Sequence, residues 1–553
     1  MLNHYRLTMP MFDAEVEKTL SRQCLDPALP YYGVTPDFAK GYCEPTMGCG
    51  NAALLMTAYY NPDAARYHDP LLLERAAMAM DYTLSMVHED GSIDLMETNF
   101  HDATLNGFAL HNLGPAVLVM QRDSEHTPAE EALLEKCLSF VRSSADAMVN
   151  LGFHTPNHRW VTSASLAYCW RITGDERCRR KIDDFLAEGV DCDENGEYTE
   201  RSAGIYNCTC NQTLMIMADQ LNMPELRAHV ARNLRLAPVY FEPDDTVNTL
   251  NSTRQDMGRA PDRRVYYSNY LTAALEDGDG AFAYYADEML KKTMGQFQYG
   301  AGYTGVPQMS LFLLHPEWEE RFAQITPVQP ETDFERLMPD TGILRKRQGD
   351  LTLTLIKDRP LFCRVQAGSH LLTLRYAGSF FGNGQFQPQT LQAMEDGGYR
   401  MTMVKRAGYK RPLNPPPASP MWKDMDHSKR ETVAVQEYRV TVEIHLENRI
   451  LTVRTKTEGC DNIPVKLELM LQPGGMLDVG TADFFTRAGD YIFLRSGEAT
   501  YTYSDFSRIT VRGAFQAHNY GSNMRGAQPG DGGSLTLAMT AFSPSDETVT
   551  VQF

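Results

Sequence analysis

The sequence lacks several features that would assign a protein class directly. It has no apolar run of the roughly 18 residues that a membrane-spanning helix needs. Its start, MLNHYRLTMPMF, has neither the basic head nor the apolar stretch of a signal peptide. Its 11 cysteines are an odd number without regular spacing, and Cys208-Thr209-Cys210 lacks the CxxC spacing of zinc sites. We therefore expect reduced thiols, no metal site and a cytoplasmic location.

Positive charge is also scarce. The 52 Lys and Arg residues are outnumbered by 71 Asp and Glu residues, which gives a net charge of −19. Nucleic acids and anionic membranes need a basic face, so neither is expected as the main partner. The chain has no Walker loop, no GxSxG and no HExxH, and the glycines of Gly378–Gly384 do not match a dinucleotide-binding loop. No cofactor is predicted.

The 553 residues change character once, near residue 325. Before this point, apolar residues recur at the three- and four-residue spacing of one-faced helices. About ten helices in hairpin order are expected, which favours an α/α toroid, an incomplete barrel of helical hairpins. The clearest predicted helices are Leu71–Val87, Pro128–Asn150, Val161–Ile172, Glu176–Leu186, Thr209–Leu221, Pro224–Leu236, Val265–Leu275 and Phe282–Met294.

After this point, apolar and polar residues alternate as in strands. About 220 residues of this kind fit a large antiparallel β-sandwich. The expected organisation is thus an α+β multidomain chain, with a catalytic α/α toroid over 1–325 and a β-sandwich over 326–553. The Pro-rich stretch Pro412–Pro420 is expected as a surface loop. The predicted strands are Leu351–Ile356, Leu371–Tyr376, Tyr438–Leu446, Ile450–Thr455, Val465–Leu471 and Ser534–Ala541.

Two polar clusters in the helical part are candidates for binding. Asn99 and His101 fall in a stretch that is expected to be a loop before a helix, where they either bind a ligand or serve as capping and turn residues. Asn157-His158 precedes an apolar helix, and Asn157 alone could be an N-cap. However, His158, Arg159 and Trp160 together suit recognition of a sugar that carries a carboxylate.

Two further clusters follow. Glu200, Arg201 and Tyr206 lie on a predicted loop that runs into a helix, where Tyr206 could equally be a half-buried structural residue. Arg254 and Arg259 belong to the most basic stretch of this acidic chain, residues 248–264. Guanidinium groups match carboxylates, so this stretch is either an anion site or a solvated loop that pairs with its own aspartates.

Taken together, these clusters resemble the heparinase II/III-like polysaccharide lyases, which include alginate and oligoalginate lyases. The resemblance covers the domain order and about twenty motif residues. The family often has a His-x-His-x-Asp loop early in the sheet domain, and here Ser369–Thr373 has only His370. The residues that carry the resemblance are Asn157, His158, Gly196, Tyr198, Glu200, Ser202 and Tyr206.

The resemblance implies β-elimination of a 4-linked uronide in an acidic oligosaccharide or polysaccharide. Asn157, with Arg254 as a second group, would neutralise the substrate carboxylate. Tyr206 would act as the acid, and either Tyr206 or His158 would act as the base. Substrate contacts are expected from Asn99, His101, Trp160, Glu200, Arg201, Arg259 and His370.

Two alternatives remain open at this point. One is a toroid glycoside hydrolase of the unsaturated glucuronyl hydrolase type, in which Asp102 or Asp94 would be the general acid-base. Those enzymes usually end after the toroid, whereas this chain continues. The other is a carbohydrate-binding protein without catalysis, which fold alone does not exclude.

Overall fold

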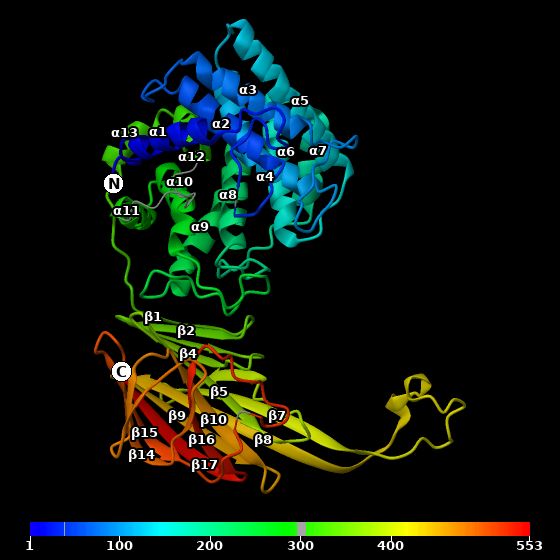
Figure 1. Ribbon diagram of the computed structural model, residues 1–553, viewed down its shortest axis with the longest axis vertical. Helices are drawn as coiled ribbons and strands as arrows, with labels where there is room; N and C mark the ends of the chain where they lie inside the picture. Colours follow the sequence, from blue (N-terminus) through cyan, green and yellow to red (C-terminus); the bar gives the residue numbers. More distant parts are fainter. Residues whose placement is uncertain (38, 296–305, 522) are drawn as a thin grey trace. The chain divides into compact units, whose positions relative to one another are not determined.

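The computed structural model describes residues 1–37, 39–295, 306–521 and 523–553. The chain divides into two compact units: Met1–Phe241 with Thr246–Pro330, and Glu242–Asp245 with Glu331–Phe553. The first is helical and the second consists mainly of antiparallel strands (Figure 1). The predicted class, a helical toroid followed by a β-sandwich, is confirmed.

The first unit, as far as it is described, contains thirteen α-helices and three short 3-10 helices. They are α1 (His4–Arg22), α2 (Thr46–Tyr60), α3 (Pro70–Leu84), α4 (Ala103–Met120), α5 (Pro128–Asn150), α6 (Pro156–Thr173), α7 (Glu176–Ala187), α8 (Tyr206–Gln220), η1 (Pro224–Leu226), α9 (Arg227–Leu236), η2 (Ala237–Tyr240), η3 (Arg263–Tyr266), α10 (Tyr267–Asp277), α11 (Gly280–Gly295), α12 (Val306–Leu314) and α13 (Trp318–Gln324).

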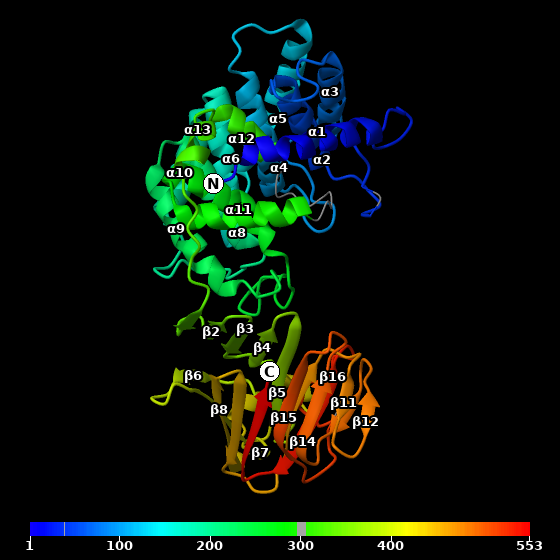
Figure 2. The same ribbon diagram turned by 90° about the vertical axis from the view of Figure 1, so that its left-hand side faces the viewer.

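Alternate helices form the inner ring of the toroid. α2, α4, α6, α8 and α10 contact one another in succession, and α12 contacts both α2 and α4. α3, α5 and α7 pack outside them, as Figure 2 shows for α3 and α5 beside α2 and α4. The inner helices α2 and α4 are buried on nearly all sides, so they lack the one-faced apolar pattern by which a helix is recognised in sequence. This explains why α2 is not among the predicted helices, whereas α4 was expected only from the polar loop before it.

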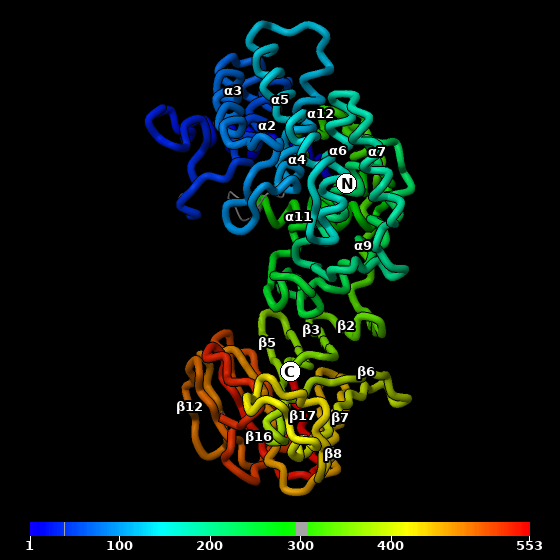
Figure 3. The backbone as a smooth tube through the Cα atoms, turned by 90° about the vertical axis from the view of Figure 1, so that its right-hand side faces the viewer, coloured from blue at the N-terminus to red at the C-terminus, as the bar shows by residue number. Residues whose placement is uncertain are grey.

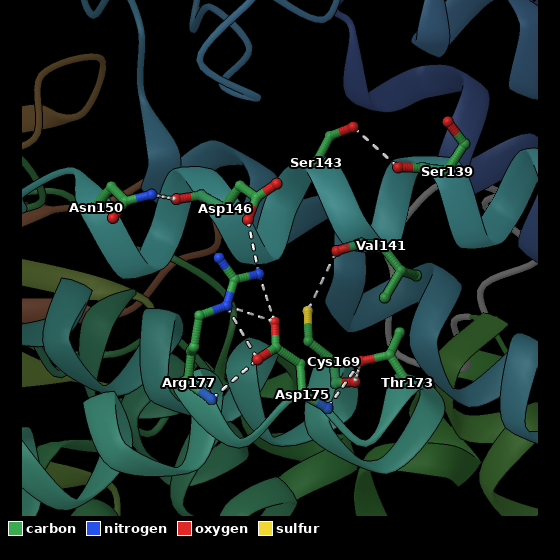
Figure 4. A network of polar contacts seen from close by, with 9 residues as sticks. All are labelled: Ser139, Val141, Ser143, Asp146, Asn150, Cys169, Thr173, Asp175 and Arg177. Atoms are coloured by element: carbon green, nitrogen blue, oxygen red, sulfur yellow. Dashed lines mark hydrogen bonds and ion pairs between the residues drawn. The ribbon is translucent and has the colours of Figure 1, made fainter.

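Local signals fixed several helix ends. Thr127 caps α5 in a complete capping box with Glu130, and Pro128 occupies the first helical position. The junction between α6 and α7 is drawn in Figure 4. Gly174 ends α6 in the left-handed conformation, and Asp175 caps α7. Arg177 then bridges Asp175 and, at 2.8 Å, Asp146 of α5. The predicted helices Val161–Ile172 and Glu176–Leu186 are thus confirmed as separate elements with this junction between them.

The second unit contains two sheets with the strand orders β1-β2-β3-β4-β5-β10-β16-β13 and β12-β11-β14-β15-β17-β9-β8-β7-β6. Figure 3 shows β6, β7 and β8 together in this unit. The strands are β1 (Phe334–Met338), β2 (Ile343–Gln348), β3 (Leu351–Ile356), β4 (Cys363–Ala367), β5 (His370–Gly378), β6 (Thr390–Ala393), β7 (Tyr399–Lys410), β8 (Thr432–Glu447), β9 (Ile450–Glu458), β10 (Pro464–Leu471), β11 (Met476–Asp478), β12 (Asp483–Phe485), β13 (Tyr491–Phe493), β14 (Ser496–Thr502), β15 (Arg508–Phe515), β16 (Leu535–Phe542) and β17 (Ser545–Gln552).

Apolar side chains from both sheets form one core between them. Leu353 and Val365 come from the first sheet, and Val440 and Val453 from the second. β13 pairs with β16 in parallel, whereas the other strand pairs in these sheets are antiparallel. The predicted strand Leu351–Ile356 coincides with β3, all of whose residues are buried. Its leucines alternate with threonines, and the threonines are buried as well as the leucines.

Two general features complete the fold. All 11 cysteines are free thiols. Within the described parts of the chain, none of the helices combines the length and the apolar character that crossing a membrane requires.

Candidate active site

The candidate site lies in the first unit, where the starts of α6 and α8 meet the loop before η3. Thr155 precedes α6 in an extended conformation, and its side chain makes no capping hydrogen bond. Instead, the backbone N–H of Asn157 donates to Oε2 of Glu200 at 3.2 Å. The first N–H groups of a helix lack internal partners and carry partial positive charge. The Glu200 carboxylate thus stabilises the start of α6 from 43 residues away in sequence.

The side chain of Asn157 is also turned toward the protein. It is buried, and Nδ2 donates to Oε2 of Glu200 at 2.7 Å and contacts Oγ1 of Thr155 at 3.2 Å. Its Oδ1 is buried and has no hydrogen-bond partner among the described residues. Asn157 is therefore not an N-cap. The expected donation of its amide protons to a substrate carboxylate does not match this arrangement, because both protons face protein oxygens.

Arg254 completes this cluster. Its Nε lies 3.2 Å from Oε1 of Glu200, yet neither atom has an aligned hydrogen bond in the described structure. Its guanidinium carbon lies 5.5 Å from the centre of the Tyr206 ring. The loop is held in place by Thr253, whose backbone N–H and hydroxyl both donate to the carbonyl of Glu200, at 3.1 and 2.9 Å. Glu200 therefore positions Arg254 through its backbone as well as its carboxylate.

Tyr206 is the first residue of α8 and is half-buried. Its backbone N–H donates to the hydroxyl of Ser202 at 3.1 Å. The amide of Gln255 donates to the phenol oxygen, which leaves the phenol proton free to be donated elsewhere. Gln255 was not among the predicted site residues. In the sequence, only its position next to Arg254 indicates that it could belong to the site.

Burial shapes the protonation of the groups around Arg254. Burial raises the pKa of Glu200, although hydrogen bonds from Asn157 and the charge of Arg254 act in the opposite direction. Burial lowers the pKa of His158 to about 4, and the charges of His154 and Arg254 add to this effect. His158 is therefore neutral at pH 7, with a buried Nδ1 that has no hydrogen-bond partner in the described part of the chain.

A second buried network lies beside the first. Burial raises the pKa of Glu197 to about 7, against the effect of a hydrogen bond from the Tyr240 hydroxyl. Nδ2 of Asn251 donates to the Tyr240 hydroxyl at 3.2 Å, and Nη1 of Arg201 lies 3.5 Å from Oδ1 of Asn251. Arg201 thus contacts this network. Glu197 was missed in the sequence because nothing there distinguishes it from the neighbouring acidic residues.

Asn99 and His101 lie in the loop before α4. Asn99 donates to Asp102 at 2.9 Å, and Asp102 in turn caps α4. The charge of Asp102 acts on His158, which places this loop near the start of α6. His101 is exposed and contacts Asp90 at 2.7 Å.

The two carboxylates of the hydrolase alternative are poorly suited to act as acids. Both oxygens of Asp102 are occupied, by the start of α4 and by Asn99. Burial raises the pKa of Asp94, but hydrogen bonds from the backbone of His101 and from His88 outweigh it and hold the pKa below its usual value. A general acid must be protonated near neutral pH, so this geometry does not favour a hydrolase.

Of three other predicted binding residues, one is buried, one is exposed and one belongs to the second unit. Trp160 is fully buried, and its Nε1 donates to Asp191 at 2.9 Å. Its predicted contact with substrate is wrong, because the side chain is part of the core. Arg259 is exposed. His370 belongs to the second unit, where its Nε2 lies 2.8 Å from both Asp505 and Ser507.

A separate cavity of about 210 Å³ lies among the inner helices, against α8, α10 and α12. Its lining includes His111, Gln212, Asn269 and Gln308, but not Tyr206, Glu200 or Arg254. Within the described ranges, no group of three or more His, Cys, Asp or Glu residues could hold a metal ion.

Comparison with known proteins gives a likeness in fold only. No protein-family model matches the sequence, and no curated protein matches it. Heparinase III has a similar structure, with a TM-score of 0.55 and 9% identity, over 100% of this chain and 85% of that one. Chondroitin AC lyase of Streptomyces coelicolor A3, solved in complex with chondroitin sulphate, gives 0.52 and 11%, over 99% and 79%.

A xanthan lyase of Paenibacillus gives a TM-score of 0.54 with 9% identity. The match covers 98% of this chain but only 56% of that lyase. At such low identities, the likeness supports the arrangement of toroid and sandwich and carries no residue roles.

Proposed function

We propose that this protein is a lyase that cleaves a 4-linked, uronic-acid-containing oligosaccharide or polysaccharide by β-elimination. One observation carries the proposal. Buried polar atoms of Asn157, His158, Glu200 and Arg254 have no hydrogen-bond partner among the described residues, and they gather beside Tyr206. Buried polar atoms are normally paired, so such a cluster suits a polar ligand. The fold, shared with solved polysaccharide lyases, supports the same reading.

In the proposed reaction, Arg254 neutralises the substrate carboxylate. The C5 proton next to that carboxylate is weakly acidic, and its removal requires negative charge to spread onto the carboxylate oxygens. A guanidinium group matches a carboxylate in charge and shape. Glu200 holds Arg254 in place. Asn157 acts through Glu200, and its Oδ1 remains to accept a substrate hydroxyl.

Proton transfer is assigned to His158 and Tyr206. Neutral His158 takes the C5 proton, the electron pair forms the C4=C5 double bond, and the C4–O bond breaks. Tyr206 donates its proton to the leaving oxygen. A bound carboxylate would raise the pKa of His158 and strengthen it as a base. In the rival assignment, Tyr206 both takes the C5 proton and donates a proton to the leaving oxygen. Its phenol must then be deprotonated before it can take the C5 proton.

Ultraviolet absorbance tests the proposal directly. The C4=C5 double bond is conjugated to the carboxylate and absorbs, whereas hydrolysis of a saturated uronide creates no such chromophore. We expect absorbance to rise with at least one of heparan sulfate, chondroitin sulfate, hyaluronan, alginate and glucuronan oligosaccharides, and to stay flat with the Tyr206→Phe variant. A flat trace with every substrate, together with tight binding of one of them, would contradict elimination and indicate a binding protein.

A further inference from the structure

β7 and β8 continue as a two-stranded ribbon beyond the sheet that contains them. β6 pairs with β7 only as far as Thr402, and β9 pairs with β8 only from Arg439 onward. The pairing of β7 with β8 continues to Lys410 and Thr432. Residues 404–437, here called the arm, therefore have no third strand at their sides. Figure 1 shows the arm in yellow, projecting from the sheets and ending in η4 (Trp422–Asp424) and η5 (His427–Lys429).

The arm exposes large apolar side chains. Trp422 is 69% exposed, Tyr409 65% and Met421 54%. The tip also contains Pro412–Pro420, which forms the predicted irregular surface loop. A two-stranded ribbon has little stability of its own in water, and exposed aromatic groups on it are typical of a surface that binds something.

Trp422 is held in place although most of it is exposed. The guanidinium carbon of Arg430 lies 4.9 Å from the centre of its ring, and the His427 ring lies 4.2 Å away. Nε2 of His427 donates to the carbonyl of Trp422 at 2.8 Å, and Nε of Arg430 donates to Nδ1 of His427 at 3.0 Å. A ring fixed in advance loses little conformational entropy when a ligand stacks on it.

The arm is basic in an acidic protein. It has seven Lys and Arg residues and four Asp and Glu residues, whereas the whole chain has a net charge of −19. Arg411 and Lys429 pair with carboxylates of the arm itself. Lys410 donates to the Thr432 hydroxyl, and neither it nor Lys423 forms an ion pair with any described carboxylate. These ammonium groups remain available to anionic groups of a ligand.

We propose that the arm is a second glycan-binding site, distinct from the candidate active site, that holds an acidic polysaccharide. The apolar C–H faces of its sugar rings would stack on Trp422 and Tyr409, and its carboxylate or sulfate groups would contact Lys410 and Lys423. The choice of a glycan among polyanions rests on the proposed function. Such a site would keep a long chain on the protein between cleavage events, and it would contribute little to short oligosaccharides.

The test measures retardation in native gels that contain chondroitin sulfate, heparan sulfate or alginate, with dextran as the neutral polymer. The full-length chain carries Tyr206→Phe, so that the polymer stays intact. We expect at least one acidic polymer to retard this protein and dextran not to. The pair Trp422→Ala and Tyr409→Ala should weaken binding at least tenfold. The pair Lys410→Gln and Lys423→Gln should weaken it less and reduce its salt dependence.

Two further variants complete the experiment. In the first, residues 411–431 are replaced by Asn-Gly, so that a two-residue hairpin turn joins the paired residues Lys410 and Thr432. This variant should bind as weakly as the double variant Trp422→Ala and Tyr409→Ala. The second, the matched control Phe485→Ala with Lys456→Gln, changes an exposed aromatic and an exposed lysine elsewhere in the second unit. It should bind like the parent protein.

Four results would overturn the proposal. The arm variants could bind like the parent, or the parent could bind no acidic polymer. Single-stranded DNA could bind as tightly as the polysaccharides. Light scattering could show that the arm variants change the molecular mass in solution, which would make the arm a contact between copies of the chain. Elimination by the wild-type protein on oligosaccharides is measured separately, so failure of the arm proposal leaves the proposed function testable.

Discussion

Two clusters in this molecule each bring polar and charged side chains together, but they are built differently. In the second unit, Asp505 and Ser507 sit in one turn, and both contact the same nitrogen of His370, Nε2. A Ser-His-Asp relay needs its serine and its aspartate on opposite ring nitrogens. Hydrogen bonds from Ser507 and the contact with His370 lower the pKa of Asp505 to about 2, and this carboxylate is exposed. Asp505 and Ser507 thus hydrogen-bond to each other and to His370 of β5, within the cluster itself.

The candidate active site shows the opposite pattern. Asn157, Glu200 and Arg254 come from three separate segments of the first unit, and each is buried or half-buried. Each keeps a polar atom without a hydrogen-bond partner in the described structure. Residue type alone therefore does not distinguish the two clusters: the candidate active site differs in that several buried polar atoms without partners come together from separate segments.

The largest effect is expected from Tyr206→Phe. Removal of the phenol proton donor should lower kcat about 10²–10⁴-fold, the usual contribution of acid-base catalysis. Absorbance at saturating substrate measures this, and the substrate Kd should change little. The matched change in the second unit, His370→Ala, should leave kcat within about twofold. Equal losses in both variants would remove the distinction between the clusters.

A somewhat smaller effect is expected from Arg254→Gln. Loss of the cation should lower kcat/KM about 10²–10³-fold, comparable to the loss of one oxyanion donor. Arg449→Gln, which breaks an exposed ion pair with Asp350 in the second unit, is the control and should be close to neutral. Unchanged kcat/KM in Arg254→Gln would show that another group neutralises the carboxylate.

The pH dependence of kcat/KM separates the two possible bases. If His158 is the base, it must be neutral, and burial lowers its pKa to about 4 in the free protein. The kcat/KM value should then be flat from about pH 8 to about pH 5 and fall tenfold per unit below about pH 4. His158→Gln should abolish this acid limb. A rate that instead increases steadily into the alkaline range would favour Tyr206 as the base.

The smallest effect is expected from Glu197→Gln. Burial raises the pKa of Glu197 to about 7 in the folded protein. At a pH between the pKa of Glu197 in the unfolded chain and about 7, the folded state binds this proton and the unfolded state does not. The free energy of unfolding of the wild type therefore falls as pH increases through this range. The variant should lack this fall, and its Tm relative to wild type should increase by a few degrees from about pH 5 to pH 8. Calorimetry measures it, and a Tm difference independent of pH would contradict the assignment.

Much of the fold was predictable from sequence. The ends of α5 and the junction between α6 and α7 follow from local capping signals, Thr127 with Glu130 and Gly174 with Asp175. β3 was found from its alternation of leucine and threonine. The helices α1, α2, α12 and α13 were missed, and for α2 the reason is burial on almost all sides, which removes the amphipathic pattern.

The sequence by itself determined the order of a helical and a sheet unit, because apolar periodicity is written along the chain. It also placed Tyr206 on a loop that runs into a helix, although the structure begins α8 at Tyr206 itself rather than at the predicted Thr209. Only the tertiary structure decided that Glu200 and Thr155 take the side-chain amide protons of Asn157, that Trp160 belongs to the core, and that Arg254 lies over Tyr206. The physical reason is that hydrogen bonds and burial between distant segments depend on how the chain packs, which local patterns do not encode.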